Sequence, residues 1–242
     1  MQSFVPARVC GLLLCVCVLP SQASASVVIA TTRVIYPAQQ SEVTVRLSNE
    51  GSSPSLVQAW IDDGRAQAAL EDLDVPFSLS PPLFRIDPKK GQSLRIAKLG
   101  QALPADRESL YWLNILDVPP KADGNVLQVS LRSRIKLLYR PVGLSGSAAE
   151  AYLQLTWKLV SDTQGWALEA HNPTPYFINL SSLDMLQGGG ELHGEPSHVP
   201  PLASTRFAIP GLQPAPGASV KVSYAAIDDY GALRESVGLA RP

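Results

Sequence analysis

Glutamate and histidine side chains gather between residues 191 and 198, and both types are common ligands of metal ions. The candidates are Glu191, His193, Glu195 and His198. Glycine and proline surround them, a composition typical of solvated surface loops. We therefore expect an exposed loop here, and the sequence predicts no metal site and no other cofactor.

Hydrolytic chemistry would need a nucleophile and a base in register. The three histidines are His171, His193 and His198, and none of them lies in a nucleophile motif. Residues 143–147 (GLSGS) lack the second glycine of a nucleophile elbow at the required place. No glycine-rich phosphate loop or dinucleotide fingerprint occurs. These observations argue against a hydrolase, and the sequence predicts that the protein is not an enzyme.

Two basic residues, Arg33 and Lys136, lie in segments that alternate like β-strands. Strand cations usually face solvent, so periodicity alone makes each an exposed charge. The same reasoning makes Glu108, Arg140 and Asp229 ordinary solvated charges. What these groups can do depends on the elements that position them.

Residues 1–25 have the pattern of a secretory signal peptide. Arg8 precedes an apolar run, residues 9–19, that is too short to span a bilayer, which needs about 20 apolar residues. Residues 23–25 (ASA) match the cleavage pattern, so we expect the mature chain to begin at Ser26. The mature chain should contain no disulfide, because this segment holds every cysteine: Cys10, Cys15 and Cys17.

The composition excludes several classes of protein. The 242 residues are 45% hydrophobic and 17% charged, with a formal net charge of −1. These values exclude a disordered chain and a basic protein that binds nucleic acid. With 21 prolines and 17 glycines, the chain suits short strands better than long helices. No stretch after residue 25 is apolar enough to insert into a membrane.

Alternation of apolar and polar residues predicts a series of short strands. Residues 42–47 (EVTVRL) place their apolar side chains on one face, as a half-buried strand does. Short strands between proline- and glycine-rich turns are typical of a β-sandwich. Further strands are expected at 56–61, 93–98, 110–118, 152–160, 166–171, 176–183, 206–209 and 220–227.

The segment 125–140 alternates for longer than one small sandwich can use. A strand usually has about 5 to 6 residues, whereas this segment would extend about 45 to 50 Å if unbroken. Leu127, Val129 and Leu131 share one face of it. From alternation alone, these three side chains face either the core of their own domain or a partner.

Residues 141–147 are rich in glycine and serine and form the best candidate for a linker. They divide the chain into an expected N-terminal domain, residues 26–143, and a C-terminal domain, residues 148–242. Each has about the hundred residues that an immunoglobulin-like sandwich needs. The predicted fold class is therefore all-β, with two immunoglobulin-like β-sandwich domains.

Several ordered motifs closely resemble the signature of PapD-like periplasmic pilus chaperones of the short-loop type. They are residues 32–33 (TR), 58–61 (QAWI), 107–114 (RESLYWLN), 118–120 (VPP), 125–128 (NVLQ), 135–141 (IKLLYRP), 172–176 (NPTPY) and 229–231 (DYG). The resemblance covers nearly the whole chain after residue 25. It implies that the two domains are set at an angle.

The resemblance also implies a function. Proteins of this family are ATP-independent periplasmic chaperones that bind, fold and cap pilus or fimbrial subunits and deliver them to an outer-membrane usher. A subunit lacks its final strand, which leaves a hydrophobic groove between unpaired edges. The chaperone lends a strand of its own by donor-strand complementation. Here the lent strand would be the first half of 125–140, with Leu127, Val129 and Leu131 in the groove. Self-capping of free molecules into an oligomer stays open.

The resemblance assigns roles to the isolated charges. Arg33 and Lys136 align with the family's cleft pair, which anchors the terminal carboxylate of the subunit. Glu108, Arg140 and Asp229 match the interdomain ion network that holds the angle of the cleft. The composition would also fit a secreted immunoglobulin-like adhesin or carbohydrate-binding module. That rival class would need neither the overlong strand nor the pair of cations.

Overall fold

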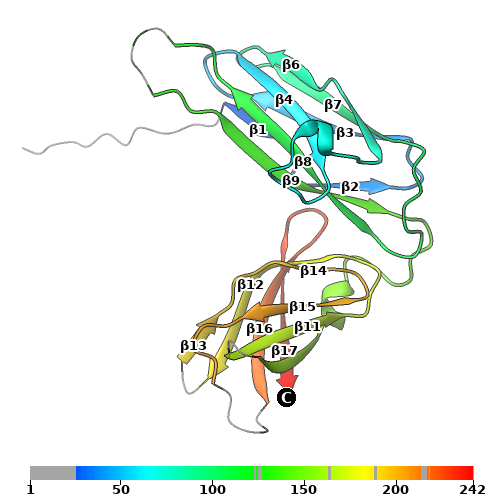
Figure 1. Ribbon diagram of the computed structural model, residues 1–242, viewed down its shortest axis with the longest axis vertical. Coiled ribbons are helices and arrows are strands. Elements are labelled where there is room, and N and C mark those ends of the chain that lie inside the picture. The colour runs from blue at the N-terminus through cyan, green and yellow to red at the C-terminus, as the bar shows by residue number, and fades with distance from the viewer. Residues whose placement is uncertain are drawn as a thin grey trace, which may run out of the picture.

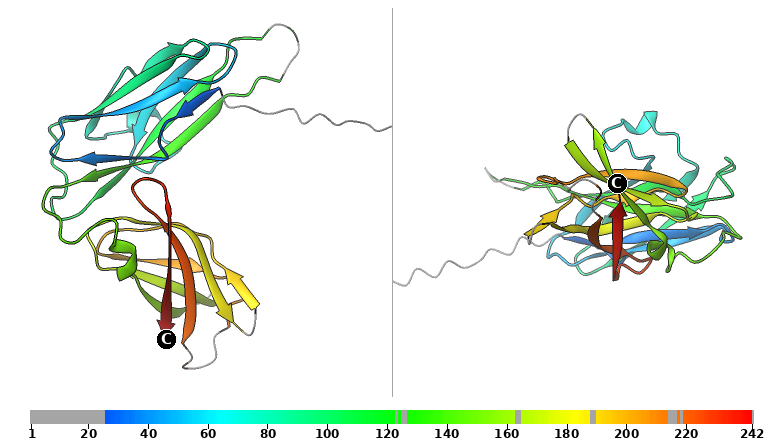
Figure 2. Two further views of the ribbon diagram at one scale, coloured as in Figure 1. Left: turned by 180° about the vertical axis from the view of Figure 1, so that it is seen from behind. Right: turned by 90° about the horizontal axis from the view of Figure 1, so that it is seen from below.

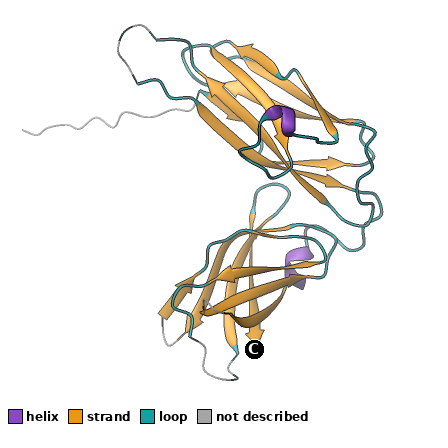
Figure 3. Cartoon of the chain, in the orientation of Figure 1, coloured by secondary structure: helices purple, strands orange, loops and turns teal. Residues whose placement is uncertain are grey.

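The computed structural model describes residues 26–122, 124, 127–162, 165–187, 190–213, 217 and 219–241. These residues form two β-sandwiches that meet at an angle (Figure 1). Strands dominate both, and the short 3-10 helices η1 (Leu70–Asp72) and η2 (Ala151–Gln154) are peripheral (Figure 3). The predicted all-β fold with two immunoglobulin-like domains is confirmed. The expected signal peptide, with its cysteines, lies outside the described residues.

The first domain packs a four-stranded sheet against a five-stranded one. The smaller sheet has the order β1 (Val27–Ile29), β3 (Glu42–Asn49), β7 (Gly91–Lys98), β5 (Phe77–Ser80). The larger sheet has the order β2 (Arg33–Pro37), β9 (Leu131–Arg140), β8 (Ser109–Val118), β4 (Ser55–Asp62), β6 (Leu83–Ile86). Only β2 and β9 run parallel among the strand pairs described in this domain.

Apolar side chains of one parity on each strand fill the space between these sheets. Leu94 and Ile96 of β7 face Leu113 and Ile115 of β8, and all four are fully or almost fully buried. Tyr36 is also buried, and its hydroxyl donates to the carbonyl of Ser41 at 2.8 Å and accepts from the amide of Lys98 at 3.0 Å. A buried hydroxyl that is satisfied in this way adds no desolvation penalty.

The second domain is a sandwich whose strands pair continuously, so that one curved sheet encloses a single core. Its strand order is β13 (Gly190–His193), β12 (Ile178–Gln187), β16 (Val220–Ile227), β17 (Leu233–Arg241), β10 (Thr156–Asp162), β11 (Gly165–Asn172), β15 (Ala203–Ala208), with β14 (His198–Val199) beside β12. Trp157 lies in the core with Phe207 and Tyr224. The turn between β16 and β17 projects toward the first domain in both directions of view (Figures 1 and 2).

Two local expectations differ from the structure. Residues 152–155 are not strand: η2 ends at Gln154 and β10 begins at Thr156. Of the long strand expected over 125–140, residues 125 and 126 lie outside the described residues, residues 127–130 are not strand, and β9 begins at Leu131, whose partner Asp117 is the last residue of β8 to pair with it. Within β4, Trp60 is half-buried, because Ala59 and Ile61 take the inward parity.

Candidate functional site

The parallel pairing of β2 with β9 brings Arg33 and Lys136 together. The two residues are direct partners in the register, so their side chains leave the same face of the sheet. Arg33 Nη1 donates to the carbonyl of Ile227 at 3.0 Å. Lys136 Nζ donates to Asn179 Oδ1. Two cations of the first domain therefore lie at the junction with the second.

This pair of cations is short of negative charge. Arg33 is only 7% exposed, and its Nε is buried without a hydrogen-bond partner among the described residues. Burial lowers the pKa of Lys136 to about 8, and the charge of Arg33 adds to this effect. Burial also lowers the pKa of Arg33, although Asp229 and Asp228 oppose the shift. Such a pair can bind an anion, because a carboxylate would supply the missing counter-charge.

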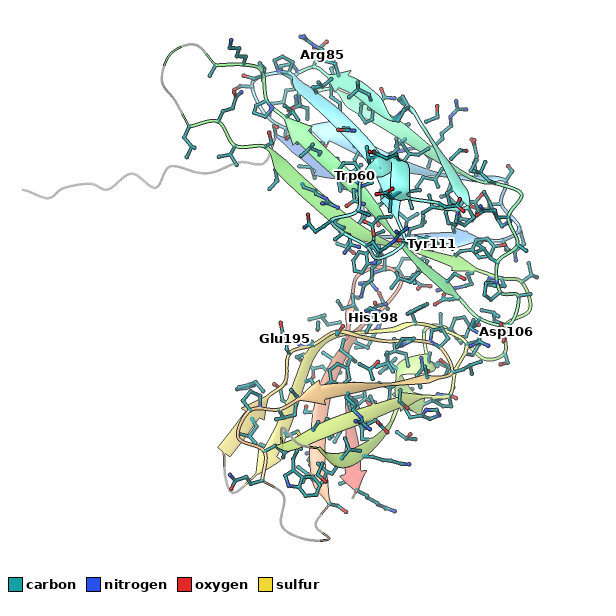
Figure 4. All side chains as sticks on the ribbon, viewed as in Figure 1. Trp60, Arg85, Asp106, Tyr111, Glu195 and His198 are labelled. Atoms are coloured by element: carbon teal, nitrogen blue, oxygen red, sulfur yellow. The ribbon has the colours of Figure 1, made fainter. Side chains whose placement is uncertain are left out.

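Two aromatic side chains, His198 and Trp112, are neighbours of Lys136. Burial, and then the charge of Lys136, lower the pKa of His198, so that this imidazole is neutral near pH 7. Figure 4 shows His198 on the side of the second domain that faces the first, and Tyr111 on the opposite side of that junction. The Nζ of Lys136 also lies 5.5 Å from the ring centroid of Trp112. The cation is thus held between the two domains.

A network that the sequence did not reveal fixes the outer face of β9. The carboxylate of Asp62, a buried residue, accepts from Arg134 Nη2 at 2.6 Å and from Asn114 Nδ2 at 2.8 Å. The guanidinium of Arg134 lies 4.1 Å from the centroid of Trp112, and that of Arg132 lies 4.9 Å from Trp60. Alternation showed the cations, but their partners come from β4 and β8, which are distant in sequence. These contacts hold the strand that leads to Lys136.

The predicted donor residues are exposed apolar side chains. Leu127 is 93% exposed, Val129 67% and Leu131 45%. Residues 127–130 have no regular structure, and Leu131 is the first residue of β9. The segment leaves the first domain at the end remote from the second (Figures 1 and 2). Of the two interpretations that alternation left open, burial in their own core is wrong.

Arg140, at the end of β9, joins the two domains through paired carboxylates. Its Nε donates to Glu108 Oε1 at 2.6 Å, and its Nη1 and Nη2 donate to Asp229 at 2.7 and 2.9 Å. Glu108 is 2% exposed and also accepts the amide of Phe177 at 2.7 Å. Asp229 lies in the turn between β16 and β17. The structure therefore brings together all three residues of the predicted network.

Burial and paired charge act in opposite directions on Arg140 and on Glu108. Burial alone would lower the pKa of Arg140, but hydrogen bonds and charge from Asp229 and Glu108 raise it above the usual value. Burial raises the pKa of Glu108, and the charge of Arg140 opposes that rise. The hydrogen bonds that Glu108 accepts from Arg140 Nε and from the amide of Phe177 favour its ionised form.

The stretch around residue 195 does not form a metal site in the described part of the chain. No group of three histidine, cysteine, aspartate or glutamate side chains there could hold an ion. His193 instead pairs with Asp184 at 2.7 Å, and His198 lies in β14. Among the described residues, no helix is both long and apolar enough to cross a bilayer.

Comparison with known proteins gives concordant matches over both domains. Residues 26–145 match the family described as "Pili and flagellar-assembly chaperone, PapD N-terminal domain", and residues 150–237 match "Pili assembly chaperone PapD, C-terminal domain". The chaperone protein FimB/FhaD of Bordetella pertussis is 49% identical over 219 residues, which cover 87% of this chain and 86% of that protein.

Solved structures agree with these sequence matches. The YadV chaperone, a probable fimbrial chaperone of Escherichia coli, has a crystal structure that matches with a TM-score of 0.77 and 39% identity, over 90% of this chain and 100% of that one. The SafB chaperone of Salmonella enterica, solved in complex with the SafA pilin, matches with a TM-score of 0.74 and 30% identity, over 92% of this chain and 99% of that one.

Proposed function

The chain belongs to the PapD-like family of pilus-assembly chaperones, and from this membership we propose how its own residues perform that task. It is a chaperone of pilus subunits. The client is a subunit whose sandwich lacks one strand. The chaperone binds along the open groove and supplies the strand, which folds and caps the subunit.

Residues 127–131 supply the lent strand in this proposal. Three facts support it: residues 127–130 have no strand partner of their own, the apolar side chains of the segment share one parity, and these side chains are exposed. Backbone hydrogen bonds to the client edge would provide affinity, and Leu127, Val129 and Leu131 would fill groove pockets. Each side chain could contribute about 1.5 to 3 kcal/mol before ordering costs are subtracted.

Arg33 and Lys136 anchor the carboxylate at the end of the subunit chain. The unpartnered Nε of Arg33 and the depressed pKa of Lys136 support this assignment, because both indicate cations without a sufficient counter-ion. Charge-assisted hydrogen bonds contribute about 1.5 to 3 kcal/mol each. The anchor also fixes register, because a slip by one residue would turn the apolar side chains away from the groove.

The ion network of Arg140 has a geometric role. It sets the angle between the domains, and thereby the position of Arg33 and Lys136 relative to the lent strand. Support comes from the contacts themselves, since Arg140 and Glu108 belong to the first domain while Asp229 and the Phe177 amide belong to the second.

The remaining parts of the assignment follow the family. The chaperone works in the periplasm after removal of residues 1–25, and it passes its client to an outer-membrane usher. It performs no catalysis and consumes no nucleotide. A later exchange of the lent strand for a strand of the next subunit can proceed downhill by itself.

The exposure of Leu127, Val129 and Leu131 on one parity carries this proposal, and paired substitutions test it. Val129→Ser should reduce recovery of the co-expressed pilin at least tenfold, because it removes one groove contact. Gln128→Ser, on the opposite parity of the same segment, serves as the matched control and should recover the pilin normally. Equal recovery of the pilin with both variants would contradict the assignment of residues 127–131 as the lent strand.

A further inference from the structure

A buried carboxylate at the far end of the first domain has an oxygen without a partner. Asp117 of β8 is 6% exposed. Its Oδ2 accepts from the amide of Val27 at 3.2 Å and from the hydroxyl of Ser26. Its Oδ1 is buried and has no hydrogen-bond partner among the described residues. A buried charge left in this state is costly unless a cation or another donor completes it.

Both donors to Asp117 come from the first two residues after the expected cleavage point. Ser26 is held in place, because its carbonyl accepts the amide of Glu50 at 2.7 Å and its hydroxyl lies 3.0 Å from the hydroxyl of Ser55. The α-nitrogen of Ser26 is only a few bonds from its own Oγ and from the nitrogen of Val27. It is therefore confined to the neighbourhood of the Asp117 carboxylate.

We infer that Asp117 is the binding site for the α-ammonium group of the mature chain. The inference rests on the proposed removal of residues 1–25. In the precursor, the Ser26 nitrogen is a neutral amide with one hydrogen. Hydrolysis adds the hydroxyl of water to the Ala25 carbonyl carbon and its hydrogen to the Ser26 nitrogen, which then takes a proton from solvent. The resulting ammonium has three donors and a positive charge, the complement that the Oδ1 lacks.

The position of this ion pair connects it with the client-binding segment. Asp117 is the last residue of β8 that pairs with β9, and its partner there is Leu131. Residues 127–130 leave the sheet at this point. The ion pair thus fixes the base of the lent strand, and a chain that still carries its leader lacks this contact.

Selective acetylation tests the ion pair. The chain beginning at Ser26 is prepared with its α-amine free or acetylated, in three forms: wild type, Asp117→Asn and Glu71→Gln, the last removing an exposed carboxylate of the same domain. Acetylation should lower the Tm of the first domain by about 3 °C or more in the wild type and in Glu71→Gln, and leave Asp117→Asn unchanged. An equal shift in all three forms, or no shift in any, would overturn the inference.

A second measurement covers the case in which Asp117→Asn does not fold. The α-amine of the wild-type chain should react with acetic anhydride at least tenfold more slowly in the native state than in urea, and equal rates would overturn the ion pair.

The mass of the exported protein separately tests where the leader is removed. A chain that begins at Ser26 supports formation of the ion pair by removal of the leader. Another first residue would overturn this inference but would leave the proposed binding of pilin unaffected.

Discussion

At the residue scale, the proposed anchor for the subunit carboxylate depends on two cations, Arg33 and Lys136, that the fold holds without enough negative charge. Each makes one hydrogen bond to the second domain, and these acceptors are uncharged: the Ile227 carbonyl and the Asn179 amide. A carboxylate that binds to these two cations gains more binding free energy than one that binds to a surface lysine, because solvent screens a partly buried pair less.

Removing one of these cations should separate binding from folding. Lys136→Ala should reduce pilin recovery at least tenfold and leave the free energy of unfolding unchanged or slightly higher, because the substitution relieves repulsion with Arg33. Co-purification and chemical denaturation measure the two effects. Lys158→Ala, an exposed lysine of β10, is the control and should change neither. A variant that loses pilin only because it unfolds would speak against an anchoring role.

The depressed pKa of Lys136 gives a pH dependence with a defined sign. Its value is about 8 in the free chaperone, and a bound carboxylate raises it because it favours the protonated amine. Affinity for the pilin should therefore be full below pH 8 and fall by up to tenfold per pH unit above it. His198, whose pKa is lowered, is neutral throughout this window.

Titration calorimetry of the pilin's C-terminal peptide from pH 7 to 10 measures this effect. Lys136→Arg keeps its charge over the whole range and should bind with a flat profile. A wild-type profile that is equally flat would show that Lys136 does not carry the proton linked to binding.

Sequence alone could not place these residues in space. Alternation made Arg33 and Lys136 exposed charges, and only resemblance to the PapD-like family joined them. Their neighbourhood depends on the parallel pairing of β2 with β9, strands that lie a hundred residues apart. The Asp62 and Asn114 contacts were missed for the same reason, because each lies on a different strand from the cation that it binds.

At the element scale, alternation found the strands that have one buried face and missed those that do not. Residues 42–47, 93–98 and 220–227 were predicted close to their observed bounds, because each has an inward row of apolar side chains. β17 was missed, since most of its residues are exposed and its apolar residues do not form a core-facing row. Its place in the sheet depends on pairing with β16.

β17 nevertheless contains a position where packing allows no side chain. A Cβ added at Gly238 would lie 2.4 Å from Trp157 Cδ1 in the core of the second domain. Gly238→Ala should therefore lower the free energy of unfolding of this domain by about 1 to 3 kcal/mol. Gly100→Ala, where no atom lies within 4 Å of the added Cβ, should lie within about 0.5 kcal/mol of the wild type. Denaturant unfolding followed by tryptophan fluorescence compares the two variants, and equal stability would show that Trp157 can move.

At the scale of the whole molecule, a few charged contacts join the two domains, and in our proposal they set the angle between them. Arg140 binds carboxylates from both domains, and the Glu108 amide donates to the carbonyl of Pro175 at 2.9 Å. Because such pairs are directional, they are better suited to fixing an orientation than to adding stability.

Arg140→Ala should loosen this angle while each domain keeps its fold. The expected result is a larger radius of gyration and a broader distance distribution in solution scattering, together with weaker pilin binding. Arg234→Ala serves as the control, because it breaks an ion pair with Asp228 that lies wholly within the second domain. Scattering curves that coincide for the wild type and both variants would contradict the proposed role.

Hydrogen exchange of the backbone of residues 127–131 tests the central claim most directly. In the free chaperone these amides should exchange quickly, because residues 127–130 have no strand partner. With a bound pilin they should slow at least a hundredfold, as expected for amides in the interior of a sheet. Fast exchange in the complex, with protection appearing only on other surfaces, would contradict the account.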